Sequence, residues 1–378
     1  MNPVLLTVSG LIPADLEAQI AQGTRPLTDY IALSRAFHAD LLDYARAREH
    51  GGLIGQLLDK TLGRDFMLGW VCFKLRKQYK VIFTDGEQVG IPFAFFTKWF
   101  GWGKRPQHLM IVHILSVKKK MIFFDWFGIQ SHIDKFLCYA TRQVKFIEDR
   151  WKIPQGRAVF TPFMVDADFF SPDKVDRLPA PGLRQAEQEI SASLADLAQL
   201  QLPILCAVGL EFRDYPTLLE AVKGLEVHVV VAAGSPWSKR SDSTEGQDIP
   251  GNVTVRRFTQ FDLRGLYAMS RFMVMPLLEN DFQAGVTALL EAMAMERAII
   301  CSQTRGQTDV IVEGENGLYV SPGDPAALRA AIEHLLAHPE EAERMGKNGR
   351  QRIETEMSLN HYVRRLNGYV HEALTAGS

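Results

Sequence analysis

A glutamate at position 291 lies within an otherwise apolar helical stretch, residues 279–300, which read ENDFQAGVTALLEAMAMERAII. On a helix, Gln283, Thr287 and Glu291 are spaced four residues apart and form one polar stripe, while the leucines turn elsewhere. The apolar run that closes the stretch is typical of a strand. The pattern therefore predicts a loop, a helix and a strand, with a polar stripe that meets water, a partner or a ligand.

The start of this helix has the properties of an anion site. Backbone N–H groups near Ala284, Gly285 and Val286 lack partners within the helix, and together with the helix dipole they favour an anionic or hydroxyl-rich ligand. Gly285 lets a ligand approach the backbone closely. A carboxylate two turns further along, Glu291, accepts hydrogen bonds from two vicinal hydroxyls such as those of a ribose. The stretch therefore predicts a nucleoside-binding helix.

The elements around this helix alternate between short apolar runs and longer segments of helical periodicity, such as residues 27–48. This alternation predicts βαβ units with parallel sheets, in which ligands bind beyond the carboxyl ends of the strands. The expected strands are residues 4–8, 80–84, 109–114, 159–163, 204–208, 227–232, 253–258, 272–275 and 298–301.

The length of 378 residues exceeds the usual size of one hydrophobic core, so we expect two domains. A proline-rich segment, SPDKVDRLPAPG, is typical of a linker after residue 170. The sequence thus predicts an α/β protein with two Rossmann-like domains, residues 1–170 and 171–359, facing one another across a cleft. A last helix within residues 360–378 is expected to pack back onto the first domain.

Composition narrows the class of protein. The formal net charge of -2 argues against a nucleic-acid binder driven by overall charge, although residues 60–160 hold 18 Lys and Arg against 7 Asp and Glu. The four cysteines are far apart and without zinc spacing, which indicates reduced core residues. Neither a signal peptide nor an apolar run of about 18 residues is present. We therefore expect a cytoplasmic protein, with the inner face of the membrane as an alternative location.

Several stretches, taken together, resemble glycosyltransferase family 4. They are the helix of Glu291, GQTDVIVEGENGLYVSPGDPAAL, HPEEAERMGKNGRQRI, AVGLEFRDYPTLLEA and FTPFMVDADFFSP, and the resemblance covers about residues 200–360 well. It implies a GT-B fold and transfer of a sugar from a nucleotide diphosphate with retention of anomeric configuration. It also implies that no metal or cofactor is needed.

The resemblance assigns roles to the polar stripe. Glu291 matches the second glutamate of the E(x7)E motif, which binds the ribose hydroxyls, and the first glutamate falls on Gln283. Glutamine at that position departs from the family pattern, since the first acid contacts the donor sugar. Gln283 itself, or Asp281 or Glu279 from a shifted loop, is expected to take that place.

Further donor contacts follow from the same resemblance. Arg213 stands where a diphosphate-binding lysine is expected, and arginine offers phosphate a bidentate fork. The family's arginine has no clear match at Leu210 or Glu211, and Lys239 and Arg240 are weak substitutes.

Two short segments also match donor-binding parts of the family. Phe258 and Thr259 resemble the segment that contacts the base, and Ser9 and Gly10 resemble a loop that touches phosphate or acceptor.

In the first domain, His113 follows the run LMIV, where family members often have a histidine near the donor sugar. Ser116 and Lys118 extend the same polar loop. Asp85 and Glu87 follow the run KVIFT and are candidates for orienting an acceptor hydroxyl.

Each of these residues also has a structural interpretation. Glu291 could serve in a helix-capping network or an ion pair between domains, and Arg213 in a surface ion pair. His113 could be a core histidine, and Asp85 and Glu87 simple turn residues. The DxD at residues 166–168 is interpreted as structural, with no metal bound.

Two stretches, PFAFFTKWFGWGKR and SVKKKMIFFDWFG, combine aromatic and cationic residues. Core packing in a Rossmann-like domain is the favoured interpretation, and contact with an anionic membrane is the alternative. Single-stranded nucleic acid also suits such composition, but no nucleic-acid motif supports it.

The sequence therefore predicts a retaining glycosyltransferase that moves a hexose from a nucleotide-diphosphate sugar, preferably UDP-glucose-like, to a small-molecule, glycan or lipid acceptor. The alternatives are a nucleotide-sugar epimerase on the same fold and a degenerate GT-B binding module without catalysis.

Overall fold

The computed structural model describes residues 2–175, 194–234, 244, 246 and 248–376, and the chain divides into two compact units. The first consists of Met1–Leu16, Leu27–Pro162 and Leu359–Ser378, and the second of Glu17–Pro26 and Phe163–Ser358. The boundary precedes the predicted one because Val165, Phe169 and Phe170 pack in the core of the second unit. The predicted cleft between the domains stays a prediction.

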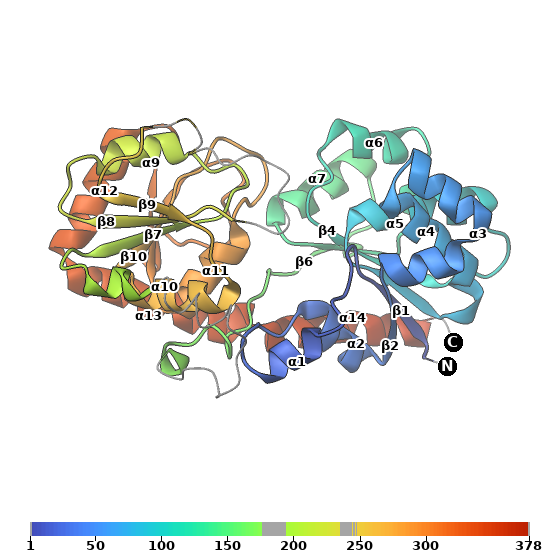
Figure 1. Cartoon of the computed structure of the whole chain (residues 1–378). Helices are drawn as coiled ribbons and strands as arrows, with labels where there is room; N and C mark the ends of the chain where they lie inside the picture. Colours follow the sequence, from blue (N-terminus) through green and yellow to red (C-terminus); the bar gives the residue numbers. More distant parts are fainter. Residues whose placement is uncertain (1, 176–193, 235–243, 245, 247, 377–378) are drawn as a thin grey trace. The chain divides into compact units, whose positions relative to one another are not determined.

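The first unit is built on a six-stranded parallel sheet in the order β2-β1-β3-β4-β5-β6 (Figure 1). The strands are β1 (Val4–Thr7), β2 (Ala39–Leu42), β3 (Val81–Thr84), β4 (Gln107–Val112), β5 (Lys135–Cys138) and β6 (Ala158–Phe160). Every residue of β1 and β3 is buried. Helices cover both faces of the sheet, which explains why its strands read as continuous apolar runs.

The helices of the first unit separate onto the two faces of this sheet. The helices that belong to the first unit are α2 (Asp29–Phe37), α3 (Tyr44–Thr61), α4 (Arg64–Leu75), α5 (Glu87–Phe100), α6 (Lys118–Asp125), α7 (Thr141–Trp151) and α14 (Leu359–Ala376). Helix α1 (Leu16–Ala21) begins where the chain passes to the second unit. The C-terminal helix α14 packs beside α2, and α3 to α6 pack in sequence on the other face (Figure 1).

One predicted helix is wrong: residues 27–48 form α2, β2 and the start of α3 rather than a single helix. His38 adopts the left-handed conformation, with φ of 49°, and ends α2. The next four residues, ADLL, pair in parallel with β1. A strand this short, with an aspartate inside it, has no periodicity that the sequence could show. The strands β5 and β12 were missed as well.

The second unit repeats the architecture, with a parallel sheet in the order β12-β11-β10-β7-β8-β9 (Figure 1). Its strands are β7 (Ile204–Val208), β8 (His228–Ala232), β9 (Val253–Arg256), β10 (Phe272–Met275), β11 (Ala298–Ser302) and β12 (Gly317–Val320). Its helices are α9 (Tyr215–Val222), α10 (Gln260–Met269), α11 (Val286–Ala294), α12 (Pro325–Ala337) and α13 (Pro339–Arg352). Apolar side chains of α9 and α12 pack on one face, and those of α10 and α11 on the other.

The four cysteines are buried and unpaired, as the sequence predicted. Among the helices of the described residues, none combines the length and apolar character that crossing a bilayer requires.

Helix α13 packs unusually close to the turn between α11 and β11. A Cβ added at Gly346 would lie 2.1 Å from the carbonyl oxygen of Glu296, whereas a Cβ at Gly368 of α14 would meet nothing within 4 Å. Only glycine allows this approach of helix and turn backbone.

We expect Gly346→Ala to lower the free energy of unfolding of the second unit by roughly 1–3 kcal/mol, because helix and turn must move apart. Gly368→Ala, on an exposed helix position, is expected to raise stability by up to about 1 kcal/mol. Urea denaturation followed by circular dichroism measures both. Equal effects of the two substitutions would contradict the close contact.

Candidate functional site

Three loops at the carboxyl edge of the second sheet lie together around the start of α11. They follow β7 and β10, the two central strands of the sheet, and β11, the strand next to β10. Arg213, in the loop after β7, forms an antiparallel backbone bridge with Leu277, in the loop after β10. Backbone hydrogen bonds from Asp214 N to Pro276 O and from Leu278 N to Phe212 O flank this bridge, at 3.0 and 2.9 Å. The two loops are therefore held in a fixed register.

Helix α11 begins at Val286 rather than at Gln283, because Gly285 precedes it in the left-handed conformation with φ of 75°. The predicted continuous helical stripe is thus wrong in part: Gln283 lies in the loop, and only Thr287 and Glu291 share the helix. Thr287 is exposed in the first turn, one turn before the buried Glu291. Ala284 N donates to Phe282 O at 2.8 Å, so the prediction of a free N–H group there is wrong. The amides that can lack a partner within the helix belong to the turn that starts at Gly285.

Arg213 is buried against the start of α11, with 4% of its surface exposed. Its Nε donates to the carbonyl oxygen of Val208 at 2.8 Å, and its Nη1 donates to that of Glu211 at 2.7 Å. A Cβ added at Gly285 would lie 2.8 Å from Nη2, so the guanidinium rests against the helix start. Burial lowers the pKa of Arg213 from its ordinary value, though an arginine remains charged at neutral pH. The site therefore combines a fixed cation with the positive end of a helix dipole.

Glu291 lies on α11 with 5% of its surface exposed. The hydroxyl of Tyr267, from α10, donates to its Oε2 at 2.9 Å. Burial raises the pKa of Glu291 to about 7, and the Tyr267 hydrogen bond only partly offsets this. Within the described part of the chain, no other hydrogen bond to this carboxylate is made. Tyr267 holds one oxygen in place, and no motif in the sequence predicts this partner.

Three buried polar atoms beside α11 have no hydrogen-bond partner among the described residues: Gln283 Nε2, Thr304 Oγ1 and Gln307 Oε1. Gln307 is only 4% exposed, and its other amide atom, Nε2, donates to Ala284 O at 2.7 Å. Unpaired buried polar atoms are costly unless a ligand or water satisfies them. Thr304 and Gln307 were missed from the sequence, although both lie just beyond β11 and a search of every strand end would have found them.

The two acids offered as replacements for Gln283 are engaged elsewhere. Glu279 and Asp281 are each about half exposed, and their carboxylates lie 3.2 and 3.4 Å from Arg305 Nε. Glu279 also accepts from the backbone N of Arg305 at 3.0 Å. Lys239 and Arg240 fall outside the described residues.

The segment predicted to contact a base lies past the end of its strand. β9 ends at Arg256, so Phe258 and Thr259 are in the following loop rather than at the predicted strand end. Thr259 caps α10: its Oγ1 accepts from Asp262 N at 3.2 Å and donates to Asp262 Oδ2 at 2.7 Å. Its side chain is therefore occupied, and the backbone of this loop stays the predicted base contact.

At the carboxyl edge of the first sheet, Asp85 ties the loop after β1 to the end of β3. Its Oδ1 accepts from Thr7 Oγ1 at 2.7 Å and Ser9 Oγ at 2.9 Å, and its Oδ2 accepts from Ser9 N at 2.5 Å. Gly10 continues this loop, donating its N–H to Val8 O at 2.8 Å. Burial raises the pKa of Asp85 despite these donors. Ser9 and Gly10 are thus brought to Asp85, as part of one anchored turn.

Glu87 anchors the neighbouring loop, between β4 and α6. It is 1% exposed and accepts from the backbone N atoms of His113 at 2.9 Å and Ile114 at 3.2 Å, and from Lys120 Nζ at 2.6 Å. Burial opposes ionisation, but the hydrogen bond from His113 and the charges of His113 and Lys120 hold the pKa of Glu87 well below its usual range. Lys120 reaches this carboxylate from α6. Lys118, predicted to lie in the polar loop near the acceptor, is the exposed first residue of α6.

His113 is the member of this cluster that stays accessible, with 46% of its side chain exposed. Burial would lower its pKa, but the hydrogen bond and charge of Glu87 raise it above the ordinary value. The ring lies edge-on to Tyr139 with centroids 5.1 Å apart, and the Tyr139 and Tyr362 hydroxyls are 2.6 Å apart. Asp29, whose pKa burial raises to about 6, is coupled to His113 and Asp85 by charge. Asp29 and Tyr362 were not predicted from the sequence.

The DxD is a turn in the structure. Asp166 Oδ1 accepts from the backbone N atoms of Asp168 and Phe169, each at 3.1 Å. In the described part of the chain, His334, His338 and Glu341 form a group with metal-ligand spacing, at the junction of α12 and α13 and away from both strand edges.

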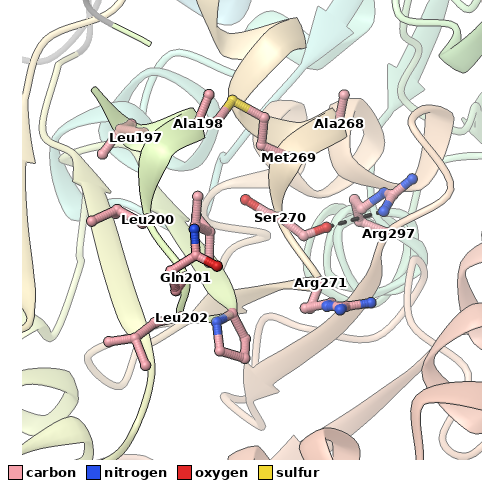
Figure 2. Close-up of a pocket in the computed structure, with 12 residues that line it drawn as sticks. Leu197, Ala198, Leu200, Gln201, Leu202, Ala268, Met269, Ser270, Arg271 and Arg297 are labelled. Carbon is pink, nitrogen blue, oxygen red and sulfur yellow. Dashed lines mark hydrogen bonds between the residues drawn. The ribbon is translucent and has the colours of Figure 1, made fainter. Parts of the chain in front are cut away.

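A cavity of about 520 Å³ lies at the opposite, amino edge of the second sheet. Figure 2 shows that Leu202, Met269, Arg271 and Arg297 line it, and that Arg297 Nη1 donates to Ser270 O, at 3.0 Å. Ligands of parallel sheets bind at the other edge, so this cavity is not part of the candidate site.

Known proteins match part of this chain by sequence. Residues 210–352 match the family described as glycosyl transferases group 1. The D-rhamnosyltransferase WbpZ of Pseudomonas aeruginosa is 30% identical over 142 residues, which is 37% of this chain and 37% of that protein. The putative glycosyltransferase EpsD of Bacillus subtilis is 40% identical over 63 residues, 17% of this chain and 16% of EpsD. These matches span well under half of each relative's own length.

Solved structures resemble the whole chain. The sucrose-phosphate synthase of Thermosynechococcus elongatus has a TM-score of 0.70 at 18% identity, with 100% of both chains covered. HepE of Anabaena in complex with UDP has a TM-score of 0.70 at 11% identity, covering 98% of this chain and 100% of HepE. These likenesses show the fold, which is GT-B with two Rossmann-like domains, as predicted.

The raised pKa of Glu291 predicts a pH-dependent stability. Between its ordinary value of 4.5 and about 7, the native state holds a proton that the unfolded chain has lost. The stability that this bound proton contributes is therefore full at pH values below the ordinary pKa and is lost as pH rises through about 7. We therefore expect the free energy of unfolding of Glu291→Gln, relative to that of the natural protein, to increase by roughly 3 kcal/mol as pH rises from 4.5 to about 7.

Urea denaturation in buffers on both sides of this window measures the difference. Glu333→Gln, at an exposed position of α12, is the control for the same change of residue type outside the interior of the protein. A stability difference between Glu291→Gln and the natural protein that does not vary with pH would contradict the buried titration.

Proposed function

We propose that this chain is a glycosyltransferase that binds a nucleotide-diphosphate sugar at the carboxyl edge of its second sheet. One observation carries the proposal: the Arg213 guanidinium rests against the glycine that starts α11, and the Glu291 carboxyl lies on the same helix. A cation and free amides suit a diphosphate, and a carboxylate two turns away suits a ribose. The match of residues 210–352 to glycosyl transferases group 1 supports this assignment.

The diphosphate is the leaving group of such a transfer, so negative charge develops on it as the bond to the sugar breaks. Arg213 is already oriented by the carbonyl oxygens of Val208 and Glu211, at 2.8 and 2.7 Å. The amides at the start of α11 belong to the turn that Gly285 forms in the left-handed conformation. Donors that need no reorganisation stabilise a transition state more than mobile ones. We therefore assign leaving-group stabilisation to Arg213 and this helix start, without a metal or cofactor.

The three unpaired buried atoms supply groups of the kind that a sugar needs. Gln283 Nε2 is a donor, Gln307 Oε1 is an acceptor, and Thr304 Oγ1 can act as either. Sugar hydroxyls both donate and accept, so this set can satisfy them. We assign donor-sugar recognition to these side chains, with Gln283 taking the place of the first motif glutamate.

The acceptor is assigned to the carboxyl edge of the first sheet. His113 is the accessible group there, while Asp85 and Glu87 act through the loops that they anchor. We propose that His113 contacts the reacting sugars and that an acceptor hydroxyl, on a small molecule, a glycan or a lipid, lies beside it. The acceptor oxygen bonds to the anomeric carbon on the face where the bond to the phosphate breaks, and a departing phosphate oxygen takes the hydroxyl proton, so the configuration is retained. Holding the reactants in place supplies the remaining rate enhancement.

A hexose carried by UDP, as in UDP-glucose, is our preferred donor. HepE, which has the same fold, was solved with UDP and with UDP-glucose. The four unpaired thiols support a location in a reducing compartment, which for this proposal is the cytoplasm.

Two other functions make different predictions. An epimerase releases no free nucleotide, and a non-catalytic module, suggested by Gln283 and the unmatched phosphate arginine, binds neither UDP nor GDP. Isothermal titration with UDP and GDP, followed by assay of nucleotide release from their hexose conjugates, separates the three. Binding without release would replace the transferase proposal, and absence of binding would end it.

Glu291→Ala should weaken the affinity for the preferred nucleotide by roughly 1–3 kcal/mol, because charged hydrogen bonds to the ribose are lost. Arg213→Lys should reduce the turnover more than the affinity, since one charge remains but the bidentate fork is removed. Glu333→Ala, an exposed change in the same unit, serves as the control. Unchanged affinity in folded Glu291→Ala protein would remove the ribose assignment.

Gln283→Ala tests sugar recognition separately from nucleotide binding. We expect its affinity for free UDP or GDP to stay within about twofold, while transfer from the nucleotide sugar falls about tenfold or more, as for one buried hydrogen bond of about 1.5 kcal/mol. Glu279→Gln and Asp281→Asn are matched controls from the same loop, where both acids already pair with Arg305. If a control lowers transfer and Gln283→Ala does not, the shifted-loop alternative is correct.

A further inference from the structure

The first unit carries a group of large apolar side chains on its surface. Trp99 is 52% exposed, Phe100 58%, Trp102 87% and Trp126 80%. Indole rings are usually largely buried, and neighbouring aromatic residues left in water mark an interaction surface. The sequence allowed two interpretations of the two aromatic and cationic stretches, core packing and membrane contact. In the structure, Phe93, Phe96 and Phe124 are core residues, while the three tryptophans and Phe100 are exposed.

A layer of half-buried rings connects α5 and α6, and the four exposed rings lie on these helices or within two residues of their ends. The ring centroids of Trp99, on α5, and Phe127, which follows α6, are 6.3 Å apart. Those of Phe127 and Phe123, on α6, are 6.0 Å apart. Phe123 in turn lies 6.2 Å from Phe66 of α4. Lys98 Nζ, on α5, also donates to Gly128 O at 2.7 Å, which joins the end of α5 to the turn after α6. The three helices pack on one face of the sheet (Figure 1). We call Trp99, Phe100, Trp102, Ile122 and Trp126 the aromatic face.

The charge around the aromatic face is positive. Residues 98–134 contain six Lys and Arg and two Asp. Both acids are already paired, Asp125 with Arg150 and Asp134 with Arg105, each at 2.6 Å. Lys104, Lys118 and Lys119 are exposed beside the rings. An anionic surface would therefore meet indoles and ammonium groups together.

We propose that the aromatic face docks this protein on an anionic phospholipid surface. Tryptophan favours the headgroup region, where the ring is buried and its N–H stays wet. Lysines beside it are attracted to anionic headgroups. The loop that carries His113 leads directly into α6, so docking places this loop next to the lipid. The proposal does not depend on catalysis.

A second copy of the chain is a less favourable occupant. In a two-fold dimer the same patch faces itself, so the lysines of both copies would be brought together and would repel. Anionic lipid has the complementary charge. Self-association is therefore an outcome that the experiment distinguishes rather than the one that we infer.

The test uses the full chain with vesicles of phosphatidylcholine alone and vesicles containing about one-third phosphatidylglycerol, separated by flotation. We expect binding to anionic vesicles at least about tenfold above binding to neutral ones, with a blue shift of tryptophan emission. Lys118→Glu with Lys119→Glu should lower the partition coefficient by about 25-fold or more, at about fivefold for each lysine lost. Trp102→Ser with Trp126→Ser should lower it at least about tenfold.

Matched controls come from the second unit: Leu200→Ser with Leu202→Ser for exposed apolar area, and Lys347→Glu for charge. Calorimetry with UDP on each variant checks folding and keeps this result separate from the proposed function. Equal binding to both vesicle types, or binding that persists without both tryptophans, overturns the proposal. Light scattering that shows a dimer dissolved by the tryptophan substitutions, without vesicle binding, assigns the face to a protein partner.

Discussion

The candidate site depends on where one guanidinium is held. Arg213 is buried at the end of β7, its N–H groups are bound by two carbonyl oxygens of its own loop, and it presses against a glycine at the start of α11. A buried cation is stable only where oxygen atoms replace water around it. The loops after β7 and β10 supply that environment through their antiparallel bridge. The same contact that keeps Arg213 in the protein interior places positive charge beside the free amides of a helix.

Glu291 shows the opposite solution for an acid. No cation neutralises it among the hydrogen bonds and ion pairs of the described residues, and burial raises its pKa to about 7, with a tyrosine hydroxyl as its partner. Such a carboxyl is poised near neutrality, where hydroxyl donors would favour its ionised form. In the first unit, by contrast, Glu87 is fully committed to backbone amides and Lys120. The pKa values of two buried glutamates thus shift in opposite directions because one has charged partners and the other does not.

The fold was largely predictable from the sequence, since buried parallel strands leave apolar runs and the helices between them leave amphipathic periods. The predictions failed where tertiary contacts decide: β2 is a four-residue strand whose only partner in the sheet is β1, and α11 starts late because Gly285 turns left-handed. For the candidate site, residue type and spacing pointed to Glu291, and the resemblance to a family pointed to Arg213. Tyr267 and Asp29 could not be found, because each reaches its place from an element distant in sequence and has no motif of its own.

The Tyr139 and Tyr362 hydroxyls join a strand end of the first unit to the last helix of the chain. A ribosome makes residue 362 only after the whole second unit has been synthesised. The first sheet therefore emerges early but waits for α14 to cover its face, with α2 beside it. During that interval the nascent chain exposes an apolar surface that the finished protein hides, and chaperones that bind such surfaces would meet this protein at that stage of its synthesis.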